Sequence, residues 1–286
     1  MNRLIMAILA VAAYILPASS KDRLLFTCIS QEEGLTFTVN SIYKEKDGDV
    51  WMGCPSGLYQ FNGHTLHKRE DSQLNERKIY QVMGDSKDCI WVLTDNWLLR
   101  RRDIEEQFSL VRIPEIDQKL PFYSMCLDET GIWFGSYGKI FRYTYKDDRF
   151  FLFCETTGYK GFDVRSMHNF DGNTLLCSSH NGLILIDKQS GEVREAPYGS
   201  RKEISALLID SRDRIWLASY NNGIEVHEKD GTLIRRYDTG CSGLSNNIVL
   251  CMTEKDSTVW AGTDGGGINI IDLEKESIDV LSHVSG

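Results

Sequence analysis

Side chains suited to sugar recognition recur at five places along this sequence, each close behind a short apolar segment. The five segments are Asp95-Asn96-Trp97, Tyr137-Gly138, His180-Asn181, Tyr220-Asn221-Asn222 and Asp264-Gly265. An aromatic ring can stack on the apolar face of a sugar, and amides and carboxylates can bind its hydroxyl groups. We therefore predict a ligand-binding surface made by Trp97, Asn96, Tyr137, His180, Tyr220, Asn221 and Asp264.

Turn geometry is the competing explanation for these residues. Asn, Asp and Gly favour tight turns for backbone reasons alone. A turn does not require a bulky aromatic residue, so Trp97 and Tyr220 are the first candidates for ligand contact.

Residues of catalytic and metal-binding types are present, but their spacing matches no known site. The histidines show neither HExxH-type nor CxxC-type spacing; they are His64, His67, His168, His180, His227 and His283. A sialidase-type Asp box would place Asp five residues before a Trp, which only Asp128 does, and Thr130 stands where that box has Gly. We predict no catalytic residues, no cofactor and no metal site.

The elements that would position the ligand-binding segments form a repeat. Five of the six tryptophans follow a Val or Ile inside an apolar segment, and Leu176 takes the same place in a further unit. The successive anchors Trp51, Trp91, Trp133, Leu176, Trp216 and Trp260 are 40, 42, 43, 40 and 44 residues apart. Turn dipeptides such as Asn62-Gly63 and Asp230-Gly231 separate the strands of a unit. Each unit therefore reads as four strands, with the Trp on the second.

Both faces of the Trp strand are apolar, so each small sheet must be covered on both sides. Gly or Ala commonly stands two residues after the Trp, which lets a neighbouring sheet approach closely. Four-stranded sheets at this period, packed radially, make a β-propeller. The prediction is an all-β propeller domain over residues 21–286, with the five tryptophans in its core. In a propeller the ligand-binding segments share one rim, beside the entrance to the central channel.

The number of blades in the complete propeller stays open. Six units are visible, and they either close alone or belong to a seven-bladed propeller. The apolar segment Leu24–Cys28 precedes the first unit and could join the last sheet as its outer strand.

The first twenty residues differ from the rest of the chain. Arg3 precedes an almost wholly apolar stretch from Leu4 to Leu16, and Ala18-Ser19-Ser20 offers a cleavage site. This pattern predicts a signal peptide over residues 1–20, cleaved near Ser20, and therefore an exported, periplasmic protein. The formal charge of −9 argues against nucleic-acid binding. We expect most of the eight cysteines to be buried thiols, with Cys54, Cys126, Cys177 and Cys251 in strands.

The first unit resembles the two-component regulator propeller repeat. Gly34-Leu35, Asp47-Gly48, Val50-Trp51-Met52-Gly53 and Gly57-Leu58-Tyr59 carry the resemblance, and the stretch from Gly243 to Ile268 is a second match. The resemblance implies the periplasmic sensor region of a hybrid two-component system, best known from gut Bacteroidetes, whose ligands are typically oligosaccharides.

Members of that family also carry a second propeller, a membrane helix and a histidine kinase core, which this sequence lacks. We therefore expect either the N-terminal part of such a sensor, membrane-linked only through missing segments, or a stand-alone binding module. The expected partners are an oligosaccharide-like ligand and a second propeller or homodimer mate. The alternatives are a protein-binding scaffold and a propeller glycan hydrolase or lyase.

Overall fold

The computed structural model describes residues 38–75, 77–95, 97–102, 105, 107–111, 122–156, 163–179, 181–198, 203–275 and 277–282. These residues form 24 β-strands in six four-stranded antiparallel sheets, and none of them lies in a helix. We number the sheets 1 to 6 in chain order. The chain divides into unit 1, Met1–Val111, with sheets 1 and 2, and unit 2, Arg112–Gly286, with sheets 3 to 6.

Within every sheet the strands pair in the order in which they follow along the chain. Sheet 1 contains β1 (Ser41–Lys44), β2 (Val50–Cys54), β3 (Gly57–Phe61) and β4 (Leu66–Lys68), and sheet 2 contains β5 (Ile79–Gly84), β6 (Cys89–Thr94), β7 (Leu98–Arg102) and β8 (Ser109–Leu110). Sheet 3 contains β9 (Phe122–Asp128), β10 (Gly131–Ser136), β11 (Lys139–Thr144) and β12 (Arg149–Glu155), and sheet 4 contains β13 (Ser166–Asn169), β14 (Thr174–Ser179), β15 (Gly182–Asp187) and β16 (Val193–Glu195). Sheet 5 contains β17 (Ile204–Ile209), β18 (Ile215–Ser219), β19 (Ile224–His227) and β20 (Leu233–Tyr237), and sheet 6 contains β21 (Val249–Lys255), β22 (Thr258–Thr263), β23 (Gly267–Asp272) and β24 (Ile278–Leu281).

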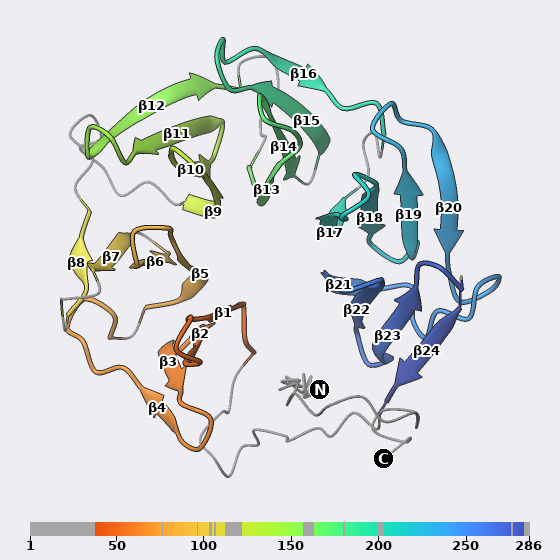
Figure 1. Cartoon of the computed structure of the whole chain (residues 1–286), viewed down its shortest axis with the longest axis horizontal. Helices are drawn as coiled ribbons and strands as arrows, with labels where there is room; N and C mark the ends of the chain where they lie inside the picture. The colour runs from red at the N-terminus through yellow and green to blue at the C-terminus, as the bar shows by residue number, and fades with distance from the viewer. Residues whose placement is uncertain are drawn as a thin grey trace. The chain divides into compact units, whose positions relative to one another are not determined.

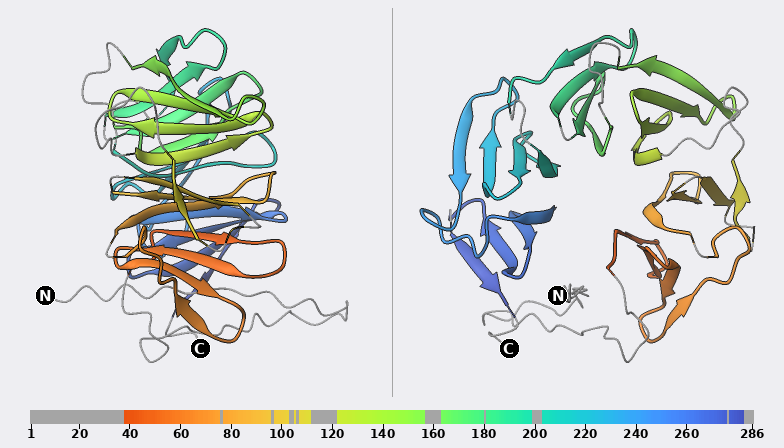
Figure 2. Two further views of the ribbon diagram at one scale, coloured as in Figure 1. Left: turned by 90° about the vertical axis from the view of Figure 1, so that its left-hand side faces the viewer. Right: turned by 180° about the vertical axis from the view of Figure 1, so that it is seen from behind.

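Consecutive sheets of a unit meet at their first strands. In unit 2, β9 contacts β13, β13 contacts β17 and β17 contacts β21, so these strands lie on the concave side of the unit while β12, β16, β20 and β24 lie outside (Figure 1). Figure 2 shows the same order from behind. The number, order and pairing of the strands confirm the predicted fold class, a β-propeller of four-stranded blades.

The Trp strand packs one sheet against the next, as the repeat predicts. In unit 1, the fully buried Trp51 shares a core cluster with Ile79 and Val82 of sheet 2. A Cβ atom added to Gly53 would lie 2.7 Å from Cγ2 of Ile79. Glycine at this position therefore permits the close approach of the two sheets, which confirms the role predicted for the small residue after the Trp.

The same packing recurs in unit 2. Trp133 lies in one core cluster with Met167 of sheet 4, Leu176 with Leu207 of sheet 5, and Trp216 with Val249 of sheet 6. Leu176 is fully buried on β14. The placement of Leu176 at the Trp position is therefore confirmed.

Trp260 departs from the prediction that all five repeated tryptophans belong to the core. Its side chain is only half-buried, whereas Trp51, Trp91, Trp133 and Trp216 are at most 3% exposed. Within unit 2, sheet 6 is the last sheet, so no further sheet of that unit covers the face that carries Trp260. The core assignment of this one residue was wrong.

Carboxylates that are buried or half-buried accept hydrogen bonds from the indole N–H groups, a feature that the sequence did not predict. Nε1 of Trp91 donates to Asp85 at 2.7 Å, and Nε1 of Trp216 donates to Asp210 at 2.8 Å. Asp128 accepts from Nε1 of Trp133 at 2.6 Å. Each carboxylate also accepts from backbone N–H groups of the hairpin turn that precedes the Trp strand. In these three sheets, one aspartate therefore fixes both the turn and the indole.

In sheet 3, a buried arginine joins this arrangement. The guanidinium of Arg142 lies 4.2 Å from the centroid of the Trp133 ring and donates to Asp128 at 2.7 Å. Burial by itself would raise the pKa of Asp128, but hydrogen bonds from Arg142, Trp133 and Thr130 outweigh it and hold that pKa well below its usual range. Asp128 is therefore a charged group that stabilises the turn and the indole.

The cysteines of the described residues are free thiols. Cys54, Cys89, Cys126 and Cys177 are buried, as predicted for most of them, and burial raises the pKa of Cys54 and of Cys126 to about 11. Cys251 lies in a strand as predicted but is exposed, because it belongs to sheet 6, the last sheet of its unit.

The leading segment Leu24–Cys28 and the predicted signal peptide lie outside the described residues. Sheet 6 has its own fourth strand, β24, from the C-terminal part of the chain. In the part of the chain that is described, no helix has the length and apolar character needed to cross a membrane.

Candidate functional site

The predicted ligand-binding segments of unit 2 lie on one edge of that unit. Each joins the second and third strands of its sheet, and the four sheets share one topology, so these connections leave the sheets on the same side. The segments that lead from one sheet to the next reach the same edge: Gly223 N donates to Asn247 O, and Asp264 N donates to Ile248 O. We call this side, with Tyr137, Asn181, Tyr220–Gly223 and Asp264–Gly266, the connection edge.

Tyr137 exposes 58% of its surface on the connection edge. It forms an isolated antiparallel bridge with Asp163, which carries an ion pair of 2.7 Å to Arg165. The backbone at Tyr137 is therefore fixed, while its ring remains accessible. The Asp163 carboxylate and the Arg165 guanidinium belong to the segment with which Tyr137 pairs.

Tyr220 exposes 60% of its surface two sheets further along. Its backbone N donates to Glu203 O at 3.1 Å, and its carbonyl accepts from Nδ2 of Asn222 at 2.9 Å. Asn221 has a φ of 59°, in the left-handed region that Asn tolerates better than most residues. Asn221 therefore serves the turn that presents the Tyr220 ring.

Asp264 is exposed in the corresponding turn of sheet 6. Its backbone N donates to Ile248 O at 2.9 Å, and its backbone carbonyl accepts from Nδ2 of Asn246 at 2.7 Å. The backbone is thus anchored at both peptide groups. The structure places Tyr137, Tyr220, Asn221 and Asp264 on the connection edge of unit 2, as the sequence predicted.

Trp97 lies in unit 1 and has a different environment from the two tyrosines. Its side chain is half-buried, packs against the core cluster of sheets 1 and 2, and lies 5.3 Å below the guanidinium of Arg77. Its backbone N donates to Oγ1 of Thr94 at 2.9 Å. Packing therefore accounts for much of this ring, which offers a smaller stacking surface than Tyr137 or Tyr220. Asn96 and His180 lie outside the described residues.

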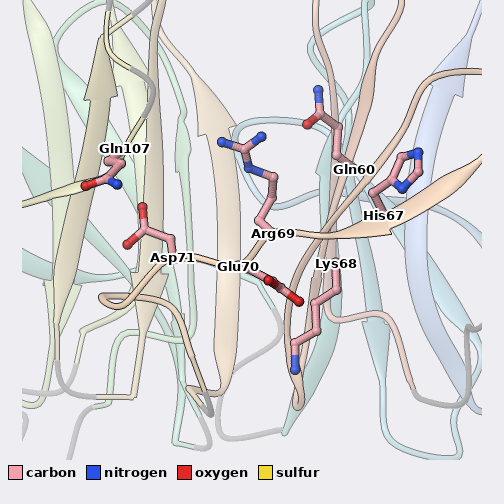
Figure 3. A pocket seen from close by; sticks show the side chains of 7 residues that line it. All are labelled: Gln60, His67, Lys68, Arg69, Glu70, Asp71 and Gln107. Atoms are coloured by element: carbon pink, nitrogen blue, oxygen red, sulfur yellow. The ribbon is translucent and has the colours of Figure 1, made fainter.

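The sequence analysis missed a polar pocket in unit 1. The pocket has a volume of about 360 Å³ and lies between β4 with the segment that follows it and the connection of β7 to β8 (Figure 3). Its lining residues are Gln60, His67, Lys68, Arg69, Glu70, Asp71 and Gln107. In sequence, His67–Asp71 reads as a charged, solvated outer strand. Only the fold brings this strand opposite Gln107.

Three carboxylates in the turn between β1 and β2 also lie together. One oxygen each of Glu45, Asp47 and Asp49 fall within 4.8 Å of one another. Glu45 pairs with Arg101 at 3.2 Å, and Asp49 accepts a hydrogen bond from Gln60. Asp47 accepts from the backbone N of Asp49 at 3.4 Å, so all three carboxylates have partners in the protein, and we assign no metal to the group.

Of the comparisons with known proteins, only the one with solved structures finds proteins similar to this chain. No protein-family model matches the chain, and no curated protein matches its sequence. The extracellular domain of a putative hybrid two-component system protein from B. thetaiotaomicron is similar with a TM-score of 0.72 and 17% identity, over 90% of this chain and 36% of that one. Virginiamycin B lyase from Staphylococcus aureus is similar with a TM-score of 0.68 and 15% identity, over 87% of this chain and 85% of the lyase.

A third similar structure is PorZ, a surface component of the type-IX secretion system of Porphyromonas gingivalis. Its TM-score is 0.67 at 14% identity, over 85% of this chain and 40% of PorZ. At such identities the likeness concerns the fold, and it confirms the β-propeller. The type of protein that the repeat resembles, the extracellular part of a two-component sensor, is among the structures with this fold. This chain spans about a third of the sensor domain's length.

Proposed function

We propose that this chain is the ligand-sensing propeller of an exported sensor in a two-component regulatory system. Its connection edge in unit 2 binds an oligosaccharide-like ligand. The observation that carries the proposal is the pair of tyrosine rings, Tyr137 and Tyr220, which are 58% and 60% exposed on anchored backbone. The likeness to a sensor's extracellular domain supports it.

The chemistry of the connection edge suits a sugar. Each exposed ring offers an apolar face on which a sugar ring can stack. Carboxylates and amides beside the rings can bind hydroxyl groups; they include Asp163, Asn222 and Asp264. Anchored turns keep the cost of ordering the site low on binding.

The wider role follows from the size of the similar sensor. Since the chain spans 36% of that extracellular domain, we place it as one part of a larger periplasmic sensor, whose remaining domains relay binding through domain contacts. A hybrid histidine kinase would supply the output. A signal peptide over residues 1–20 would direct the export.

The test is calorimetric titration of the purified protein with neutral and acidic oligosaccharides of two to six sugar units. For a binding oligosaccharide, Tyr220→Ala and Tyr137→Ala are each expected to weaken binding about tenfold, which corresponds to one lost stacking contact. Leu233→Ala is the control, because Leu233 is 43% exposed on β20 of the same sheet as Tyr220. Binding that neither tyrosine variant changes would contradict the site.

A lyase activity is the second candidate, since the likeness covers 85% of virginiamycin B lyase. A form of that lyase with a histidine replaced by alanine is catalytically inactive. His180 stands in the sequence between β14 and β15 but lies outside the described residues; of the described histidines, His64 and His67 belong to the β3–β4 hairpin, His168 to β13 and His227 to the far end of β19. We expect incubation with quinupristin to leave the compound intact, and its consumption would establish the lyase instead.

A protein-binding scaffold remains the alternative from another class. Leu233 and Ile234 are each 43% exposed on the outer strand β20, which makes a small apolar edge. If the protein forms oligomers in solution that dissociate in Leu233→Arg, and if it binds no saccharide, the scaffold would be favoured.

A further inference from the structure

The polar pocket of unit 1 is a separate site from the connection edge. It is lined from β3, β4, the segment after β4 and the connection of β7 to β8, which belong to the outer half of sheets 1 and 2. Its volume of about 360 Å³ falls in the range of small-molecule sites, roughly 300–1,000 Å³.

Strand alternation sorts the side chains that line the pocket. His67, Arg69 and Asp71 extend to one side of the strand, and Lys68 and Glu70 extend to the other (Figure 3). Gln60 pairs with His67 across β3 and β4 and lies on the same side as Arg69. The lining groups therefore differ in depth: Asp71 is buried, Gln60 and Arg69 are half-buried, and the others are exposed at the rim.

The inner side of the pocket is held in place by hydrogen bonds. Asp71 is 5% exposed, and its carboxylate accepts from the backbone N of Phe108 and of Gln73, both at 2.8 Å. Arg69 N donates to Leu58 O at 2.9 Å, and the Arg69 guanidinium lies 5.8 Å from the centroid of the buried Trp51 ring. The site is thus preformed, since its parts are tied to the cores of both sheets.

Among the described residues that line the pocket, the formal charges of the acidic and basic groups cancel. Lys68 and Arg69 are cationic, Glu70 and Asp71 are anionic, and Gln60, Gln107 and His67 add groups that can donate or accept. A charged ligand gains little from a lining without net charge. A hydroxyl group both donates and accepts, so a ligand with many hydroxyls can use both kinds of partner.

From this lining we propose that the pocket binds an uncharged, polyhydroxylated compound, a sugar unit or a polyol, by its hydroxyl-bearing edge. Among the described residues that line the pocket there is no Phe, Tyr or Trp, so the ligand is held by hydrogen bonds rather than by stacking. The ligand class overlaps with that of the proposed function, but the site and its mode of binding are independent. Since the pocket is polar, we expect a dissociation constant of about 1–10 mM.

The experiment is a titration of the ¹⁵N-labelled protein with neutral methyl glycosides, followed by backbone amide shifts. We expect saturable shifts at residues 67–71 and at Phe108. Sorbitol as a second probe and a series from one to four sugar units distinguish a polyol, a single sugar and the end of a longer chain. Methyl glucuronide, which carries a carboxylate, is expected to bind no more tightly than methyl glucoside.

Gln107→Leu provides the test by mutation, because it removes the amide that lines the pocket opposite β4 and keeps the size of the side chain. It is expected to weaken the binding seen at residues 67–71 about fivefold, while Gln189→Leu, at an exposed glutamine of unit 2, and Tyr220→Ala leave it unchanged. The proposal is overturned by the absence of saturable shifts at these amides, by unchanged binding in Gln107→Leu, or by preferred binding of the glucuronide. Loss of oligosaccharide binding in Tyr220→Ala with retained shifts at residues 67–71 would separate the two sites.

Discussion

Without one of its indole-binding carboxylates, the protein should unfold at a markedly lower denaturant concentration. In sheet 5, the Asp210 side chain is fully buried and accepts four hydrogen bonds. Its donors are Nε1 of Trp216 at 2.8 Å, Nε of Arg214 at 2.7 Å, and the backbone N of Arg212 and Arg214 at 3.0 and 2.9 Å. Asp210→Ala removes all four acceptor contacts at once.

The expected loss follows from the donors that cannot regain water. The indole N–H of Trp216 is buried, and a hydrogen bond to a charged group is worth about 1.5–3 kcal/mol. Arg214 also loses its ionic partner, and breaking a largely buried pair costs about 3–5 kcal/mol in all. The turn at Arg212 is exposed, so its N–H group can bind water instead. We therefore expect Asp210→Ala to lower the free energy of unfolding by about 3–5 kcal/mol.

The assay is urea denaturation followed by tryptophan fluorescence and far-UV circular dichroism. Asp230→Ala is the matched control, because Asp230 is exposed and its carboxylate accepts from the backbone N of Thr232 in a hairpin turn. The control is expected to lose less than about 1 kcal/mol. Combining Asp210→Ala with Trp216→Phe should cost less than the sum of the single changes, since both remove one shared contact. A loss below about 1 kcal/mol for Asp210→Ala would refute the reasoning.

Two further predictions concern packing and pH. Gly53→Val should lower the free energy of unfolding by about 1–3 kcal/mol, because the new side chain meets Ile79 of the next sheet. Gly172→Ala is the control, since a Cβ at Gly172 has open space around it. Equal stabilities of the two variants in urea would contradict the close approach of the sheets. Burial lowers the pKa of His168 to about 4 from its ordinary 6.5, so the folded state favours the neutral imidazole. The contribution of His168 to the free energy of unfolding is complete above about pH 6.5 and is lost as pH falls toward 4. Over this pH range, the free energy of unfolding of His168→Phe, followed by thermal unfolding, should therefore fall by about 2 kcal/mol less than that of the unsubstituted protein. An unchanged pH profile would count against this prediction.

The spacing of the tryptophans predicted the fold because the packing it reflects is local and repeated. Trp51, Trp133 and Trp216 each pack against the first strand of the next sheet of their own unit, so one position per repeat reports a whole interface. Even the repeat that lacks the Trp could be recognised, since Leu176 fills the same buried position. Trp260 could not be assigned correctly from the pattern, because its burial depends on a neighbouring sheet and not on its own strand.

The indole-binding aspartates were missed because the length of the hairpin turn varies. Asp128 stands five residues before Trp133, whereas Asp85 and Asp210 stand six residues before their tryptophans. One extra turn residue shifts the sequence distance while the carboxylate still reaches the indole. A search at one fixed spacing therefore finds a single member of a group of three.

The candidate site was predictable where it depends on loop position and not where it depends on contacts between sheets. Tyr137 and Tyr220 are exposed, as expected for aromatics that no turn requires. Trp97 obeys the same sequence rule but packs against the core of sheets 1 and 2, which a single sequence does not show. The polar pocket joins β4 to Gln107, some forty residues further along, so no local pattern marks it.

The location of a bound oligosaccharide tests the account most directly. A crystal structure of the protein with a saccharide that binds in calorimetry should show sugar rings stacked on Tyr220 or Tyr137 at the connection edge. A saccharide found away from both tyrosines, with the two rings still open to solvent, would contradict the proposed sensing surface.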